Sequence, residues 1–222
     1  MGIRFPVLTN PSIYKIPHLR DFAFMHSYFI IYKPYLVLSQ FTSQGAKQTL
    51  ADYFTVPKDV YPVGRLDEDS EGLLILTNDK LLNHRLLNPS FAHEREYWVQ
   101  VDGAITTEAL LQIQNGAEIT VNGQSYTTKK CSAALMLDSP RVPQREPPIR
   151  FRKEIPAPWI KLVLTEGKNR QVRKMTAKTG FPTLRLIRSR IEKLTLNNLQ
   201  PGEIISLPQK TIFKKLFGET HF

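Results

Sequence analysis

Cysteine is almost absent from this sequence, because Cys131 is the single one among 222 residues. One cysteine cannot form an internal disulfide, so packing and hydrogen bonds have to hold the fold, and the composition favours a reducing compartment. Nothing in the sequence around Cys131 indicates a catalytic thiol. We expect a small buried residue at this position.

Metal and cofactor motifs are also missing. The five histidines show no spacing typical of metal ligands, and the sequence holds neither a glycine-rich dinucleotide motif nor a phosphate-binding loop. We therefore expect no metal site and no cofactor.

The sequence has no long uninterrupted apolar run. Residues 22–38 look apolar, but His26, Lys33 and Pro34 interrupt them, which argues against a membrane-spanning segment. The N-terminus also lacks the pattern of a signal peptide. These absences predict a soluble, cytoplasmic protein that does not bind a membrane.

Acidic residues are scarce in one part of the chain. The formal net charge is +10, but residues 141–193 alone hold nine arginines and six lysines against four glutamates, a net of +11, so the remainder sums to about −1. A generally basic protein would spread its charge more evenly, whereas a nucleic-acid surface concentrates it. The distribution therefore favours a nucleic-acid partner.

The apolar pattern predicts an α+β fold. We expect strands at residues 29–33, 73–76, 95–101 and 159–165, and helices at 47–54, 80–87, 107–114 and 170–179. These elements follow no regular strand–helix repeat. The expected architecture is a large mixed, mainly antiparallel sheet flanked by helices.

An acidic turn stands directly before the apolar run at residues 73–76. It holds the carboxylates Asp67, Glu68, Asp69 and Glu71. An exposed turn is the ordinary interpretation of such a cluster. Two details favour a function for Asp67. Arg65 would lie on the same side of an extended segment and stabilise the ionised form of Asp67, and the turn opens a buried strand, which holds side chains in place.

A basic helix is expected at residues 168–175. Val172 and Met175 are three residues apart and can anchor one face, while the arginines project from neighbouring faces. A solvated helix is the ordinary interpretation of this pattern. The surrounding excess of positive charge favours contact with RNA or DNA instead.

Tyr97 and a proline-rich loop give two weaker indications. A strand tyrosine usually packs, but the ring of Tyr97 could stack on an unpaired base. Residues 138–153 are expected to form an exposed loop whose arginines, Arg145, Arg150 and Arg152 among them, suit phosphate contact. Together the residues predict an enzyme that uses an aspartate as nucleophile or general base on a nucleic acid. They do not name the reaction.

Several blocks of the sequence resemble one family of RNA-modifying enzymes. Residues 64–67, Gly-Arg-Leu-Asp, and the Asp-Ser-Glu-Gly-Leu-Leu-Ile-Leu-Thr-Asn-Asp of residues 69–79 are similar to the signature of the RsuA/RluB/RluE/RluF family of ribosomal RNA pseudouridine synthases. Three further blocks match in the same order: Lys33-Pro34, the strand that contains Tyr97, and residues 166–175.

The last of these blocks points to one branch of the family. Its Asn-Arg-Gln form, together with residues 147–150 and 180–188, is most similar to the RluE branch. The sequence departs from the family pattern at Ser70, where threonine is frequent, and at Glu192, where glycine is usual.

The resemblance implies the pseudouridine synthase fold over residues 28–207, with two subdomains around a catalytic cleft. Residues 1–27 would be an irregular arm, too short for the S4 RNA-binding domain that most relatives outside this branch carry. Residues 208–222 would be a polar C-terminal tail, with a helix as one alternative.

The same resemblance implies a reaction. Asp67 would be the nucleophile that attacks C6 of the uracil or C1′ of the ribose, in a uridine flipped out of its stack. Tyr97 would stack on the base and help to remove the proton from C5, and Arg173 would pair with Asp67 and keep it ionised. Asp67 would thus be the functional member of the acidic turn, with its other carboxylates solvated.

Contacts with RNA would come mainly from the basic segment. The expected residues are Arg65, Lys168, Asn169, Arg170, Lys174, Arg150, Arg152, Arg185 and Arg188. The implied substrate is one uridine of 23S ribosomal RNA, and the protein is expected to act as a monomer without a cofactor.

Other interpretations stay open. One is the same chemistry on a uridine of 16S ribosomal RNA or of tRNA. Another is a non-catalytic RNA-binding or ribosome-assembly protein. A glycosidase with two cooperating carboxylates is weaker, because a second carboxylate beside Asp67 would conflict with the strongly basic segment facing it.

Overall fold

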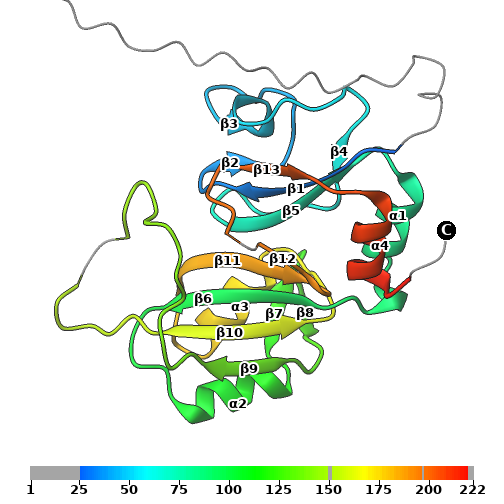
Figure 1. Ribbon diagram of the computed structural model, residues 1–222. Helices are drawn as coiled ribbons and strands as arrows, with labels where there is room; N and C mark the ends of the chain where they lie inside the picture. Colours follow the sequence, from blue (N-terminus) through cyan, green and yellow to red (C-terminus); the bar gives the residue numbers. More distant parts are fainter. Residues whose placement is uncertain (1–25, 150–151, 197, 220–222) are drawn as a thin grey trace, which may run out of the picture.

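The computed structural model describes residues 26–149, 152–196 and 198–219. Over these residues nine strands join into one mixed sheet, shown in Figure 1. All pairs along its main path are antiparallel except the pair β5–β11. The expected α+β class with a mixed, mainly antiparallel sheet is confirmed.

Seven strands form the main path of the sheet. In spatial order they are β13 (Ile204–Ser206), β1 (Tyr28–Lys33), β5 (Glu71–Thr77), β11 (Thr183–Ile191), β6 (Arg95–Val101), β10 (Trp159–Leu164) and β9 (Ser132–Leu135). Two short strands join beside this path: β4 (Tyr61–Pro62) on β5 and β12 (Leu194–Thr195) on β11. Two separate ladders pair β2 (Val37–Leu38) with β3 (Gln48–Thr49), and β7 (Glu118–Val121) with β8 (Gln124–Thr127).

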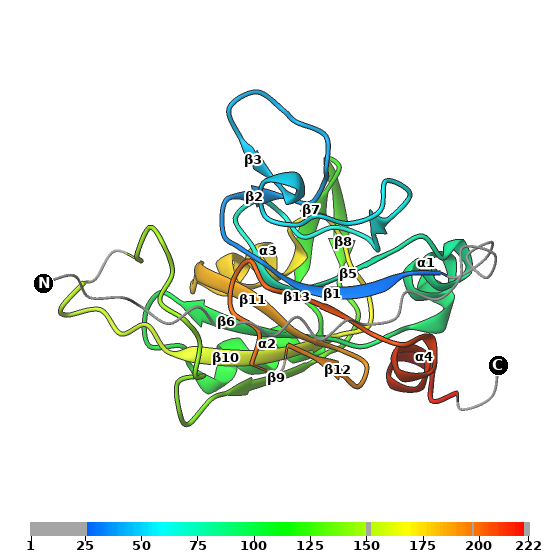
Figure 2. The same ribbon diagram turned by 45° about the horizontal axis from the view of Figure 1, so that its top comes forward.

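The helices pack in two places. They are α1 (Lys80–Leu87), α2 (Thr107–Asn115), α3 (Gln171–Lys178) and α4 (Gln209–Phe217), with 3-10 turns η1 (Leu50–Asp52) and η2 (Pro89–Phe91). In Figures 1 and 2, α1 and α4 lie side by side at one end of the sheet. Their leucines and isoleucine share an apolar cluster with β1, β5 and β11, whereas α2 and α3 share another with β6 and β10.

Apolar side chains cover both faces of the sheet around β1. Tyr28, Ile30 and Tyr32 pack in the cluster of α1 and α4, while Ile31 belongs to a cluster with Val37 on the opposite side. Successive side chains of a strand point to opposite faces, so this short, continuously apolar strand is buried on both. The arrangement explains why residues 29–33 carry no hydrophobic–polar alternation.

The parallel pair β5–β11 joins the two halves of the sheet, and we call it the seam. In Figure 1, β1 and β13 lie on the β5 side of the seam, and β6, β10 and β9 lie on its β11 side. Its register is short, with Glu71 opposite Ile187 and Gly72 opposite Arg188. Gly72 has φ +107°, and a Cβ there would lie 2.4 Å from Arg188 O. The two backbones approach so closely that the position requires glycine.

Two local expectations need correction. Residues 47–54 form the short strand β3 and the 3-10 turn η1 instead of a helix. The C-terminal segment is, over its described part, largely the helix α4, which was one of the alternatives, but it is no polar tail, because Ile212 and Leu216 of this helix are buried in the core. Nearly all of the expected arm, residues 1–25, lies outside the described residues.

Substitution of Gly72 by alanine tests the seam. The added methyl group would meet the Arg188 backbone, which can move only if β11 shifts, so we expect the free energy of unfolding to fall by about 2–4 kcal/mol. Equilibrium urea unfolding measures this change. Gly123→Ala is the matched control, because Gly123 also has a positive φ (+80°) but its Cβ would meet nothing within 4 Å. Equal losses in the two variants would contradict a special role for the seam contact.

Candidate active site

A cavity of about 690 Å³ opens at the seam. Its walls come from the turn before β5, from β6 and β11, and from the turn that leads from β10 into α3. The cavity brings together residues that belong to separate sequence motifs. They are Arg65, Asp67, Tyr97, Lys168, Asn169, Arg170 and Arg188.

The backbone on both sides of Asp67 is held by hydrogen bonds. Ser39 is buried, and its Oγ donates to Leu66 O (2.7 Å) and accepts from Leu66 N (3.0 Å). On the other side, Ser70 N donates to Asp67 O (3.0 Å). The turn is therefore a rigid support for the half-buried Asp67 side chain.

Lys33, at the end of β1, also helps to hold the acidic turn in place. Its side chain is fully buried, and Nζ donates to Pro34 O (2.8 Å) and Val37 O (2.6 Å) and more weakly to Glu68 O (3.4 Å). Burial lowers the pKa of Lys33 to about 7, although the nearby carboxylates, Glu71 first among them, act in the opposite direction. The lysine ties β1, its following turn and the acidic turn together.

Three of the four carboxylates in the acidic turn have a cationic partner. The pairs are Glu68–Lys47 (2.6 Å), Asp69–Arg170 (2.7 Å) and Glu71–Arg185 (2.7 Å). Among the described residues, the carboxylate of Asp67 has neither a hydrogen bond nor an ion pair. It is the member of the cluster that is left free to meet a ligand in the cavity.

Asp69 is held by two arginines of the basic segment. Both terminal nitrogens of Arg170 donate to its carboxylate (3.1 and 2.7 Å). Arg173 Nε lies 3.2 Å from Asp69 Oδ2, and Arg173 Nη2 donates to Asp69 O (2.6 Å). Burial raises the pKa of Asp69, but the hydrogen bonds from Arg170 and the charge of Arg173 outweigh it, so the net shift is downward.

These contacts correct the expected role of Arg173. Its ion-pair partner is Asp69, two residues beyond Asp67. Burial lowers the pKa of Arg173, and the charges of Asp69 and, more weakly, Asp67 act in the opposite direction. Asp69 is likewise not a freely solvated position. Arg173 therefore acts on Asp67 indirectly, by holding the turn on which it stands.

Glu71 and Arg185 form a buried ion pair across the seam. Arg185 donates from Nε to Glu71 Oε1 (2.8 Å) and from Nη2 to Glu71 Oε2 (2.7 Å). The Arg185 side chain is 5% exposed and that of Glu71 is 2% exposed. Arg185 Nη1 also donates to Pro143 O (2.9 Å) and so anchors the proline-rich loop. The expectations of a solvated Glu71 and an RNA-contacting Arg185 are both corrected. A buried pair contributes little net stability but fixes geometry, here that of β5 against β11.

The remaining predicted contact residues lie in different places. Arg152 pairs with Asp102 beside a second cavity of about 440 Å³, which shares no described lining residue with the first. Arg150 lies outside the described residues. Arg188 is buried next to Tyr97 instead of lying on the surface.

Glu166 organises the basic rim of the cavity, a role that the sequence did not reveal. It accepts hydrogen bonds from Tyr126 Oη (2.6 Å), Lys129 N (2.9 Å) and Gln171 Nε2 (2.7 Å). Burial raises the pKa of Glu166, but these bonds, that of Tyr126 first, outweigh it and lower the pKa overall. Lys168 Nζ lies 4.7 Å from the centre of the Tyr126 ring. Glu166 thus joins the hairpin β7–β8 to the start of α3. The sequence signal that could have revealed this role is the place of Glu166 in the block of residues 166–175 that resembles the family.

Tyr97 stands in the middle of β6 and faces the cavity. Its cross-strand partners are Leu162 on β10 and Arg188 on β11. It is 9% exposed and, like Asp67, lines the cavity. Its ring is therefore packed along its sides and can still meet a ligand at the cavity wall.

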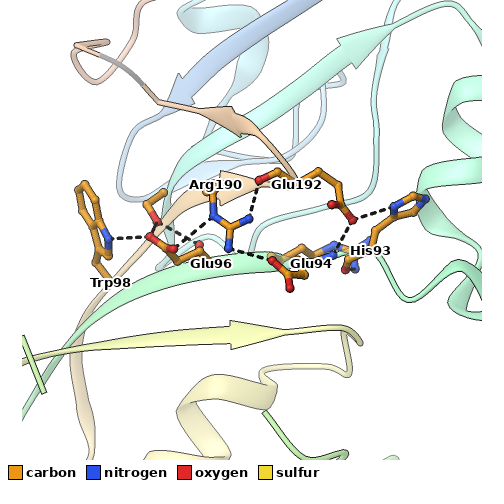
Figure 3. A network of polar contacts seen from close by, with 8 residues as sticks. His93, Glu94, Glu96, Trp98, Arg190 and Glu192 are labelled. Carbon is orange, nitrogen blue, oxygen red and sulfur yellow. Dashed lines mark hydrogen bonds and ion pairs between the residues drawn. The ribbon is translucent and has the colours of Figure 1, made fainter. Parts of the chain in front are cut away.

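A network of charged side chains lies at the start of β6 and the end of β11, as Figure 3 shows. Glu192 has a left-handed backbone (φ 47°), the conformation that favours glycine. One of its carboxylate oxygens lies 2.9 Å from both His93 Nδ1 and Glu94 N. Arg190 links Glu94 (3.0 Å) and Glu96 (3.2 Å). The contacts of the Glu192 carboxylate offset the backbone strain at this departure from the family pattern.

Two structural absences concern residues 26–149, 152–196 and 198–219. No group of three or more histidine, cysteine, aspartate or glutamate side chains in these ranges is arranged to hold a metal ion. No helix in them is both long enough and apolar enough to span a membrane.

Comparison with known proteins identifies the family. The family profile described as RNA pseudouridylate synthase matches residues 27–178, which include the acidic turn, Tyr97 and the basic helix. The chain belongs to the RNA pseudouridylate synthase family. The resemblance to ribosomal RNA pseudouridine synthases inferred from the sequence is confirmed, and with it the expected fold.

Individual relatives of this pseudouridylate synthase cover most of the chain. "Ribosomal large subunit pseudouridine synthase E" of Vibrio parahaemolyticus is 48% identical over 174 residues, which are 78% of this chain and 71% of that protein. The protein of the same name from Xanthomonas axonopodis pv. citri is 46% identical over 174 residues, 78% of this chain and 89% of that protein. A crystal structure of a pseudouridylate synthase, 26% identical, matches with a TM-score of 0.69 over 86% of this chain and 74% of that one.

The buried Lys33 predicts a pH dependence of stability. Its pKa is about 7 in the folded protein and about 10.4 in an unfolded chain. Between these values the unfolded state binds the proton and the folded state does not, so the free energy of unfolding should rise with pH. Below pH 7 both states carry the proton, and the folded state bears the full cost of the buried charge.

Urea unfolding of the wild type and of Lys33→Met at about pH 7 and about pH 9.5 measures this effect. The stability of the wild type relative to the variant should increase by roughly 1–3 kcal/mol over this interval. Subtracting the free energy of unfolding of the variant from that of the wild type removes the contribution of the other titrating groups. A difference that does not change with pH would contradict the lowered pKa.

Proposed function

We propose that the protein isomerises one specific uridine of 23S ribosomal RNA to pseudouridine, with Asp67 as the nucleophile. The observation that carries the proposal is the Asp67 carboxylate, which has no partner among the described residues and lines the cavity at the seam together with Tyr97. The relatives from Vibrio and Xanthomonas named as large-subunit enzymes support the choice of ribosomal RNA. As part of the same proposal, the protein acts in the cytoplasm and as a monomer.

The reaction exchanges one bond of the nucleotide for another. The bond from C1′ to N1 breaks, a bond from C1′ to C5 forms, and one proton moves from C5 to N1. Asp67 attacks C6 of the uracil or C1′ of the ribose, which frees the base to rotate before it is rejoined. Because substrate and product are isomers, the sum of the steps needs no further reactant.

Positioning of Asp67 is the main work of the residues around it. Ser39 and Lys33 hold the backbone of the turn, and Arg170 and Arg173 hold Asp69. A carboxylate on such a support meets its target with little loss of orientational freedom at the moment of reaction. The Tyr97 ring, at the wall of the same cavity, is placed to stack on the uracil.

The uridine has to leave its stack to reach Asp67, and the rim of the cavity offers contacts for the RNA backbone. Exposed or partly exposed polar and cationic side chains line this rim. They are Arg65, Lys168, Asn169 and Arg170, and Lys174 lies beside them with its Nζ 3.4 Å from Asn169 Oδ1. Positive side chains that neutralise phosphates release counterions, so binding should weaken steeply as salt is raised.

A non-catalytic RNA-binding protein fits the same surface less well. A free carboxylate inside a phosphate-facing cavity repels RNA, and a binder has no use for it. Modification of a 16S ribosomal RNA or tRNA uridine is the remaining alternative, and a 33% identical relative from Escherichia coli is named a dual-specificity RNA pseudouridine synthase.

Asp67→Asn tests the catalytic assignment. We expect the rate of pseudouridine formation to fall by more than about 1,000-fold, because the nucleophile is lost. RNA affinity should stay the same or rise slightly, since one negative charge is removed. Glu68→Gln is the matched control: Glu68 is the neighbouring carboxylate and lines the same cavity, but it is paired with Lys47, so its substitution should lower the rate far less. Retained modification by Asp67→Asn would contradict the proposal.

Pseudouridine mapping of total RNA tests the substrate. Cells that lack the gene should lose pseudouridine at a single position of 23S ribosomal RNA, and expression of the wild-type protein should restore it. Expression of Asp67→Asn should not. Loss at a 16S or tRNA position would support the alternative substrate, and no loss at any position would contradict both.

A further inference from the structure

Two buried arginines of β11 differ in whether they have a carboxylate partner. Arg185 and Arg188 are each 5% exposed. Arg185 pairs with Glu71 through two hydrogen bonds. Arg188 donates from Nε to Leu73 O (2.8 Å), but its Nη2 is buried and has no hydrogen-bond partner in the part of the chain that the structure describes.

A buried guanidinium without a partner is costly. Taking a cation out of water is unfavourable by several kcal/mol unless hydrogen bonds or an opposite charge compensate for it. Burial lowers the pKa of Arg188, the nearby phenol of Tyr97 acts in the opposite direction, and Arg95 adds repulsion. Because arginine stays protonated in proteins, the Arg188 charge is present and lacks a compensating anion among the described residues.

The geometry connects this charge with Tyr97. Arg188 and Tyr97 are direct cross-strand partners, so their side chains leave the same face of the sheet with Cβ atoms about 5 Å apart. Both line the cavity that contains Asp67. Arg95 on β6 and Asp67 on the turn before β5 line the same cavity, while β10 places the apolar Leu162 opposite Tyr97.

We propose that Arg188 is a positioning residue for Tyr97. In the reacting complex its Nη2–H, which has no partner among the described residues of the free protein, donates a hydrogen bond to the Tyr97 oxygen and stabilises negative charge there, which prepares this oxygen to accept a proton from the substrate. The C5–H bond of the uracil breaks, its electron pair stays in the ring, and the proton passes by way of Tyr97 to N1. This assignment rests on the proposed function, because it concerns the isomerisation itself.

Two substitutions separate the charge from the packing. Arg188→Gln removes the charge and keeps an amide that can donate to Leu73 O, whereas Arg188→Lys keeps the charge. Single-turnover formation of pseudouridine is measured with enzyme in excess, on ribosomal RNA from cells that lack the gene. Arg188→Gln should lower the rate roughly 10- to 100-fold, the effect of losing one charge-assisted hydrogen bond, without weakening RNA binding. Arg188→Lys should recover most of the rate.

A double-mutant cycle with Tyr97→Phe then distinguishes positioning from structural support. If Arg188 acts through the Tyr97 hydroxyl, Arg188→Gln should have no further effect once this hydroxyl is gone. Independent effects that multiply would overturn the proposal. Thermal unfolding of the double variant also shows whether the fold tolerates both substitutions.

The pH profile gives a second readout that does not depend on the residual rate of Tyr97→Phe. Without the Arg188 charge, the rising limb of the rate should move to higher pH, and Arg188→Lys should leave it in place. An unmoved limb in Arg188→Gln would overturn the proposal.

The same experiment separates failure of this proposal from failure of the proposed function. If the wild type forms no pseudouridine on this RNA, the proposed function is wrong. If the wild type is active and Arg188→Gln is equally active, the reaction stands and only the role of Arg188 is wrong.

Discussion

The short parallel pairing of β5 with β11 is the constraint on which the site depends. The acidic turn precedes β5, and Tyr97 lies on β6, the next neighbour of β11. Only the seam brings these two segments to the same cavity. Its close backbone approach requires Gly72, and the buried Glu71–Arg185 pair fixes one strand against the other. A change of register at the seam would move Asp67 relative to Tyr97 without touching either side chain.

Electrostatic pairing selects one carboxylate from four. Glu68, Asp69 and Glu71 each meet a cation, and each of these contacts ties the turn to another segment of the chain. Asp67, on the same rigid turn, has no such contact within the described residues. The partners therefore do two things at once: they hold the turn in place, and they leave a single carboxylate available for chemistry. In the proposed reaction, a cluster of four acids thus offers one carboxylate as the nucleophile.

The positive charge of the chain is likewise divided between inside and outside. Residues 141–193 carry a net charge of +11, but Arg173, Arg185 and Arg188 are engaged or buried around the seam. Lys168 and Arg170 are among the cations that stay exposed, and they lie where Glu166 shapes the turn into α3. The positive charge of this segment that stays at the surface is thus smaller than the charge count suggests. Arg173 and Arg185 of the basic segment instead hold the acidic turn and the strands of the seam.

The sequence by itself determined the elements and the family. Apolar periodicity predicted β6, α1, α2 and α3 closely, because these patterns depend on neighbours within one element. The motif around Asp67 pointed to the chemistry for a similar local reason. Only the tertiary structure decided which ions pair: Arg173 meets Asp69 instead of Asp67, and Arg185 meets Glu71 from a position 114 residues away. Such choices depend on distances of a few ångströms between segments that the seam brings together, and no local pattern encodes them.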